Sequence, residues 1–247
     1  MTCYFRDITS RKISESEIAR LDRLNLVGQL ASGIAHEIRN PLSVVHGYLQ
    51  LLGEKPAYVD RKSTFDLMIS ELDRANAIIT EFLSLAQIKQ TELKFKNLNE
   101  ILNNLYPLLE ADALNQNKQI CFVQGDIPNL KLNGKEISQM VLNLVRNGLE
   151  SMEERGALNI LSYVEDNRVV LEIEDQGCGI PKENLNKLGT PFFTTKDYGT
   201  GLGLATSYKI AESHNAKISV NTSSSGTTFR IHFPLPEETE EQAGMIA

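Results

Sequence analysis

One histidine stands among residues that suit the transfer of a chemical group. His36 is followed directly by the carboxylate of Glu37, and Asn40 comes one helical turn later. Apolar residues recur every three to four positions around it, which predicts a helix with one apolar seam. His36 is two residues from both Ile34 and Ile38, so its side chain falls off that seam. An exposed, neutral imidazole beside a carboxylate suits a nucleophile; an ordinary surface histidine on a dimerisation helix is the alternative.

A pair of asparagines is the second feature with chemical potential. Asn143 and Asn147 are four residues apart, so they share one face of the helix predicted for residues 136–154. Amide oxygens are suitable ligands or hydrogen-bond acceptors beside a hydrated Mg²⁺ ion. A hydrogen bond from the helix to a neighbouring loop is the alternative for such a pair.

A carboxylate and two glycines follow an apolar strand. Asp175 at the end of this strand can accept a hydrogen bond from an adenine amino group. Gly177 and Gly179 lack side chains, so the backbone there can approach a ligand closely. A plain acidic turn explains the same residues.

Glycines also precede the helix predicted for residues 202–214. Gly199, Gly201 and Gly203 would expose backbone donors at its positive end, which favours a phosphate, and Thr195 and Lys196 could reach the same anion. A later glycine turn, residues 225–227, shows by itself only a turn into the last strand. Each of these signals is weak alone.

The elements that would position these residues follow from periodicity. A turn at residues 53–57 separates the histidine helix from a second helix that begins near Asp60. A single hairpin of this kind would leave one apolar face exposed to solvent, so we expect two copies to pair as a dimeric four-helix bundle. Beyond residue 92, strands are predicted at 93–98, 119–124, 158–164, 169–174, 217–221 and 227–233, and Asn99 is expected to cap a helix to residue 115. The fold class is therefore α+β: a helical hairpin followed by an α/β sandwich domain.

Composition restricts the partners. The 247 residues carry 25 Lys and Arg against 32 Asp and Glu, for a net charge of −7, so nucleic acid is an unfavourable partner. The chain has no apolar run long enough to cross a membrane, which predicts no membrane insertion of this fragment. Three widely separated cysteines indicate a reducing, cytoplasmic setting.

The run from His36 to Pro41 resembles the phosphoacceptor box of sensor histidine kinases, which open two-component signalling pathways. The asparagine pair, the Asp175 loop, the glycine run and the 225–229 turn resemble, in order, the N, G, F and second G boxes of their ATP-binding domain. That domain shares its fold with DNA gyrase. The sequences of these motifs are similar to those of the nitrogen-sensor and sporulation-kinase branch of the family.

This resemblance implies ATP and Mg²⁺ as cofactors, His36 as the phosphoacceptor, Glu37 as its orienting carboxylate, and Asn147 as the metal ligand. Asn143 and Arg146 would lie near the phosphates, and residues 192–203 would form a lid. The implied nucleotide-binding residues are Asn143, Arg146, Asn147, Asp175, Gly177, Gly179, Ile180, Phe193, Thr194, Thr195, Lys196, Gly199, Thr200, Gly201, Leu202, Gly203 and Thr227.

It also implies a homodimer whose phosphoryl group passes to a response-regulator receiver domain, with Asn40 serving a possible phosphatase activity. The gyrase branch places a general-base glutamate where this chain has Asn143. An ATP-binding dimeric scaffold without catalysis is the alternative function. Residues 5–9 resemble the exit of PAS sensor domains, so the expected domains are a sensor remnant at 1–13, a dimerisation and phosphotransfer domain at 14–92, a catalytic domain at 93–236 and an acidic tail at 237–247.

Overall fold

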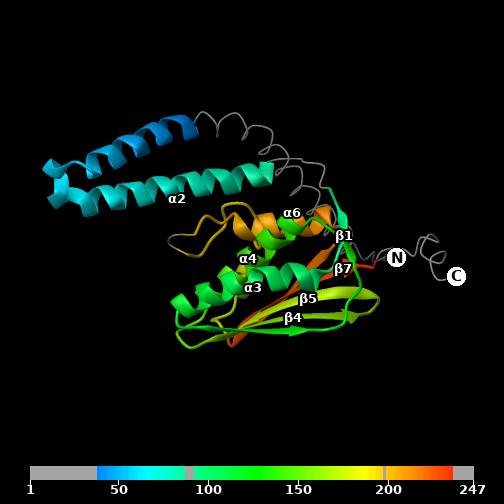
Figure 1. The fold of residues 1–247 in the computed structure, drawn as a ribbon. Helices are drawn as coiled ribbons and strands as arrows, with labels where there is room; N and C mark the ends of the chain where they lie inside the picture. Colours follow the sequence, from blue (N-terminus) through cyan, green and yellow to red (C-terminus); the bar gives the residue numbers. More distant parts are fainter. Residues whose placement is uncertain (1–37, 87–91, 197–198, 236–247) are drawn as a thin grey trace, which may run out of the picture. The chain divides into compact units, whose positions relative to one another are not determined.

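The computed structural model describes residues 38–86, 92–196 and 199–235 (Figure 1). His36, Glu37, the PAS-like residues and the acidic tail lie outside this part of the chain. The chain divides into two compact units, one with the helical hairpin and the segment Thr190–Leu202, the other with the rest of residues 90–247. Among the helices that the structure describes, none combines the length and apolar character needed to cross a membrane.

The helical hairpin consists of a first helix, described for residues 38–53, a 3₁₀ turn η1 (Pro56–Arg61) and the 25-residue helix α2 (Lys62–Ala86). Two polar contacts fix its register. Arg39 Nη2 donates to Thr80 Oγ1 at 3.2 Å, and His46 Nε2 lies 3.3 Å from Asp73 Oδ1. The first helix advances by seven residues between these contacts while α2 goes back by seven, so the helices are antiparallel, as predicted. His46 therefore bridges the two helices of the hairpin.

The hairpin leaves an apolar surface uncovered in the single chain. Its most exposed apolar side chains are Ile38, Val44, Val45, Tyr48, Leu51, Leu67 and Met68, all between 43% and 65% exposed. Leu42, Leu49 and Leu52 are only partly exposed. Asn40 and Ser43 on the first helix are exposed.

The second unit is built on a five-stranded sheet with the order β2-β4-β5-β7-β6. β2 pairs with β4 in parallel, and the other neighbours are antiparallel. A separate two-stranded sheet joins β1 to β3. The strands are β1 (Lys94–Lys96), β2 (Gln119–Gln124), β3 (Leu130–Leu132), β4 (Ala157–Glu165), β5 (Arg168–Asp175), β6 (Lys217–Ser223) and β7 (Gly226–Pro234).

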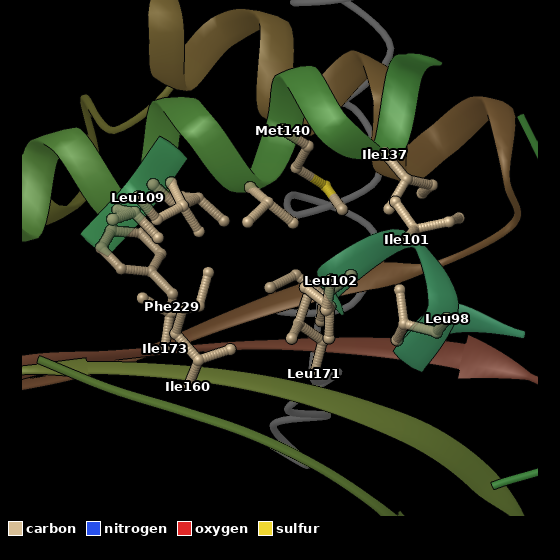
Figure 2. Close-up of a cluster of buried hydrophobic side chains, with 14 of the residues drawn as sticks. Leu98, Ile101, Leu102, Leu109, Ile137, Met140, Ile160, Leu171, Ile173 and Phe229 are labelled. Carbon is tan, nitrogen blue, oxygen red and sulfur yellow. The ribbon is translucent and has the colours of Figure 1, made fainter. Parts of the chain in front are cut away.

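Three helices cover one face of this sheet: α3 (Leu98–Asn115), α4 (Gly134–Ser151) and α6 (Gly203–Ser213) (Figure 1). β7 alternates partly buried and buried residues over most of its length, as expected for a sheet with one covered face. Figure 2 shows the core between the layers, where Leu102 and Met140 from the helices face Leu171 and Phe229 from the strands. The predicted α/β sandwich is confirmed.

Two local predictions need correction. Asn97, not Asn99, caps α3: its side chain accepts a hydrogen bond from the Asn99 N–H at 2.9 Å. Asn99 instead donates to the Gly125 carbonyl, because it already lies inside the first turn. The short helix α5 (Lys182–Leu185) and strand β3 were not predicted, since each has too few residues to show a period.

Candidate functional site

Asp175 is the buried polar centre of the second unit. It ends β5, is 6% exposed and receives three hydrogen bonds on Oδ1. The donors are Gly177 N at 2.8 Å, Ser151 Oγ at 3.1 Å and Thr227 N at 3.2 Å. Burial raises the pKa of Asp175 above its ordinary value, and these three bonds oppose the shift because they favour the ionised form. A carboxylate that is this well shielded from solvent can recognise a single hydrogen-bond donor of a ligand.

The loop after Asp175 is fixed by contacts that leave no space for side chains. A Cβ on Gly177 would lie 2.0 Å from Ser151 Oγ, and one on Gly179 would lie 1.8 Å from the Ser223 carbonyl oxygen. Gly179 also has φ of +72°, which favours glycine. Next to it, Ile180 N donates to Thr222 Oγ1 at 2.9 Å. Both glycines are therefore required by the fold of this loop.

The asparagine pair lies on α4, and both side chains are half-buried. Asn143 Nδ2 donates to the carbonyl oxygen of Gly203, the first residue of α6, at 3.0 Å. This is the link from a helix to a neighbouring segment that the sequence left open as an alternative. Arg146, on the same helix, is 60% exposed and places Nε 3.5 Å from Asp112 Oδ2 on α3.

The segment Thr190–Leu202 carries the second glycine-rich motif and is held by its own backbone. Phe192 N donates to the Gly201 carbonyl at 3.0 Å, which closes the segment into a loop. Gly201 has φ of +67°, and a Cβ there would lie 2.4 Å from the Phe192 carbonyl carbon. Within the loop, Lys196 N donates to Thr194 Oγ1 at 3.1 Å.

The donor set on α4 fits a magnesium ion that keeps other ligands. Side-chain amides at Asn143 and Asn147 offer hard oxygen atoms on one partly exposed helix face. Among the described residues, no group of three or more His, Cys, Asp or Glu side chains is placed to hold a metal. Mg²⁺ usually keeps several waters and substrate phosphates, so a site of this kind needs few protein ligands.

The structure therefore brings some predicted residues together and not others. Asp175, Gly177, Gly179, Ile180 and Thr227 form one connected cluster, in which Thr227 Oγ1 lies 3.0 Å from Thr222 Oγ1. Asn143 and Asn147 share a face of α4. The Thr190–Leu202 loop belongs to the other compact unit, and His36 and Glu37 are outside the described residues.

Three supporting residues were not identified from the sequence. Ser151 donates to Asp175; its position four residues after Asn147 is a signal that was available. Lys118, 8% exposed, donates through Nζ to the Leu149 carbonyl near the end of α4 at 2.5 Å. His214 accepts a hydrogen bond from Asn133 N, a contact for which the sequence has no signal.

Comparison with known proteins agrees with this arrangement. Residues 26–91 match the model of the His Kinase A (phospho-acceptor) domain, and residues 133–237 match that of the histidine kinase-, DNA gyrase B-, and HSP90-like ATPase. Sporulation kinase A of Bacillus subtilis is 39% identical over 233 residues, which is 93% of this chain. The chain spans only 38% of that kinase's length.

Two solved structures extend the comparison. The catalytic domain of the histidine kinase ThkA is 33% identical, with a TM-score of 0.54; the match covers 58% of this chain and 95% of that domain. ThkA in complex with the response regulator protein TrrA matches 95% of this chain and 70% of that one, with 28% identity and a TM-score of 0.63. With a phosphoacceptor domain and a histidine-kinase-type ATPase domain in one chain, this protein belongs to the family of sensor histidine kinases.

Proposed function

We propose that this chain is an ATP-dependent kinase that phosphorylates its own His36 and passes the phosphoryl group to an aspartate of a response regulator. The observation that carries the proposal is the joining of two complementary parts in one chain. A phosphoacceptor-type helical hairpin is followed by a nucleotide-type domain with a buried carboxylate at the end of β5.

The nucleotide domain would hold ATP through separate groups for base and phosphate. Asp175 accepts a hydrogen bond from the adenine amino group, while Gly177 and Gly179 keep the loop beside it free of side chains. Asn143 and Asn147 would serve the phosphates. The glycines of the Thr190–Leu202 loop offer backbone N–H groups of the kind that bind phosphate oxygens. Asn147 would be the protein ligand of Mg²⁺, which when bound would offset the negative charge that develops on the leaving ADP.

In the transfer step, the Nε2 lone pair of His36 attacks the γ-phosphorus in line. A nitrogen–phosphorus bond forms and the bond to the β-phosphate oxygen breaks, which releases ADP. Glu37 orients the ring and accepts the remaining Nδ1 proton. The phosphoryl group then moves to a receiver aspartate. Asn40, whose side chain is exposed, would position a water in the reverse, phosphatase reaction.

A hydrolytic ATPase is disfavoured by the residue at position 143. The amide of Asn143 cannot accept a proton from water, and its nitrogen is occupied by the Gly203 carbonyl. Water attack on ATP is therefore slow, and the γ-phosphoryl group remains available to His36.

The uncovered apolar surface of the hairpin supports a homodimer as the working form. A partner receiver domain is supported by the complex of the relative ThkA with TrrA. The expected setting of this fragment is the cytoplasm. The domain limits given above stay predictions.

The deciding experiment is incubation of the chain with γ-labelled ATP and Mg²⁺, followed by acid and alkali treatment of the product. Wild type should gain a label that survives alkali and is lost in acid, and His36→Gln should gain none. His46→Gln is the matched control, because His46 is a histidine of the described hairpin and contacts Asp73. Nucleotide binding without any label would instead identify the catalytically inactive scaffold.

A further inference from the structure

The three hydrogen bonds to Asp175 differ in what holds their donors. Gly177 N and Thr227 N are backbone groups, placed by the tight loop after β5 and by the start of β7. Ser151 Oγ is the one side chain among them and comes from the end of α4. It is therefore the one donor that a substitution can remove without altering the backbone.

The Ser151 hydroxyl has two acceptors within reach and one proton to give. Its oxygen lies 3.1 Å from Asp175 Oδ1 and 2.8 Å from the Gly148 carbonyl oxygen. An ionised Asp175 attracts this proton strongly, because hydrogen bonds to a charged group are about twice as strong as neutral ones. Protonation of Asp175 weakens this attraction, and the Gly148 carbonyl is then the competing acceptor for the hydroxyl proton.

The donors also decide which oxygen is presented to a ligand. All three bonds described for Asp175 end on Oδ1, and its second oxygen, Oδ2, lies beside Gly148. A Cβ at position 148 would be 3.6 Å from Oδ2. Because residue 148 is glycine, it adds no side-chain atom beside Oδ2.

We propose that Ser151 is a positioning residue for base recognition: its hydroxyl keeps Asp175 ionised and fixes Oδ1, so that Oδ2 accepts the exocyclic amino group of a 6-aminopurine. This inference rests on the proposed nucleotide site. It assigns Ser151 a role in selecting the base, through Asp175, and no contact with the nucleotide.

The surroundings of Asp175 make this single hydroxyl important. The residues that α4 and β7 place beside it are Gly148, Ser151 and Thr227, none of which carries a charge. Glu174 on the same strand raises the pKa of Asp175, as burial does, whereas the Ser151 bond lowers it. Removing the hydroxyl therefore shifts Asp175 toward its protonated form.

The test is calorimetric titration of the whole chain with ADP and with IDP, whose base carries oxygen in place of the amino group, between pH 5 and 8. Wild type should prefer ADP, and this preference should weaken at low pH. Ser151→Ala should bind ADP about tenfold more weakly. Its binding of IDP should change little. The low-pH limb, that is, the pH range in which the preference for ADP weakens, should move to higher pH in this variant.

Two further variants at position 151 test whether the hydroxyl itself is responsible. Ser151→Thr keeps a hydroxyl and should restore the preference for ADP, whereas Ser151→Cys keeps the size but is a weak donor and should behave like alanine. Ser138→Ala is the matched control, because Ser138 bonds only the Gly134 carbonyl on the same helix among the described contacts. The inference is overturned if Ser151→Ala and Ser151→Cys keep the wild-type ADP preference and pH limb, or if Ser138→Ala loses them equally. Absence of ADP binding by wild type would contradict the proposed nucleotide site itself.

Discussion

His214 Nε2 accepts a hydrogen bond from the backbone N–H of Asn133 at 3.0 Å, which joins the end of α6 to the N-cap of α4. On the other side of the ring, Nδ1 lies 2.7 Å from the Ile210 carbonyl oxygen, so the proton belongs on Nδ1. The imidazole is thus buried in its neutral form. It anchors the helix that carries Asn143 and Asn147.

This relationship predicts how stability depends on pH. Burial lowers the pKa of His214, and it outweighs the Ile210 bond and the carboxylate of Glu136, which raise the pKa. The unfolded chain therefore binds a proton from about pH 6.5 downward while the folded chain does not. Stability should be constant above that pH and fall as the pH drops from about 6.5 toward the folded pKa.

Chemical unfolding at several pH values would measure this effect, with His214→Gln as the variant. The variant should be less stable at pH 7.5 by about 1–3 kcal/mol, because Asn133 N–H loses its acceptor, and its acid sensitivity should be smaller. His232→Gln is the control, since His232 contacts Ser219 on the exposed sheet face. Equal acid sensitivity in wild type and His214→Gln would show that another group controls it.

Gly148 on α4 predicts an unusual cost for alanine. Alanine normally favours a helix by about 1 kcal/mol over glycine. Here its Cβ would lie 2.6 Å from Leu158 Cδ1 and 3.2 Å from Asp175 Cβ. Gly148→Ala should therefore destabilise the chain by about 1–3 kcal/mol, as overpacking does.

A double-mutant cycle measured by urea unfolding checks the cause. Leu158→Val removes the atom that meets the new methyl group, so Gly148→Ala should cost much less in that background. Gly134→Ala on the same helix is the control, because its Cβ would meet only the flexible end of Lys96 at 3.2 Å and a Ile101 methyl at 3.9 Å. Additive costs for the two changes would exclude the contact with Leu158.

These cases show where sequence reasoning succeeds and where it ends. The hairpin and the long strands were predicted because each has enough residues to display its period. Strand β3 was not predicted because its three residues are too few to display a period. The carboxylate of Asp175 was identified from its place at a strand end, but its donors Ser151 and Thr227 are 24 and 52 residues away. Only the folded sheet brings them together.

Asp175→Asn should separate stability from recognition. Asparagine keeps an oxygen that can accept the three bonds now made to Oδ1, and it removes a buried charge whose pKa burial has raised. As pH rises through that raised pKa, ionisation of wild-type Asp175 costs stability, so the variant should melt at the same or a higher temperature at pH 7. Its amide nitrogen would face the base where Oδ2 is now.

Nucleotide titrations would then show a change in preference. ADP should bind at least about tenfold more weakly, since two amino groups would face each other, while IDP should bind better than to wild type. Asp126→Asn is the control, because Asp126 is an exposed carboxylate away from β5. Unchanged ADP affinity in Asp175→Asn would remove Asp175 from base recognition.

The hydrogen bond from Asn143 to Gly203 gives the last prediction. Asn143→Asp keeps the shape of the side chain but places a carboxylate oxygen 3.0 Å from the Gly203 carbonyl oxygen. Two acceptors repel each other there, so the link between α4 and α6 should be lost at a cost of about 1–3 kcal/mol. Autophosphorylation should fall, because Asn143 and the start of α6 both serve the phosphate side of the proposed site.

Asn159→Asp, which replaces an amide that donates to Glu174 Oε2 on the sheet, is a matched control and should leave the labelling of His36 near wild type. Labelling by γ-labelled ATP together with phosphate release distinguishes the outcomes. Wild-type labelling in Asn143→Asp would show that this bond serves the fold alone, and faster phosphate release would show that a carboxylate at position 143 suffices to activate water.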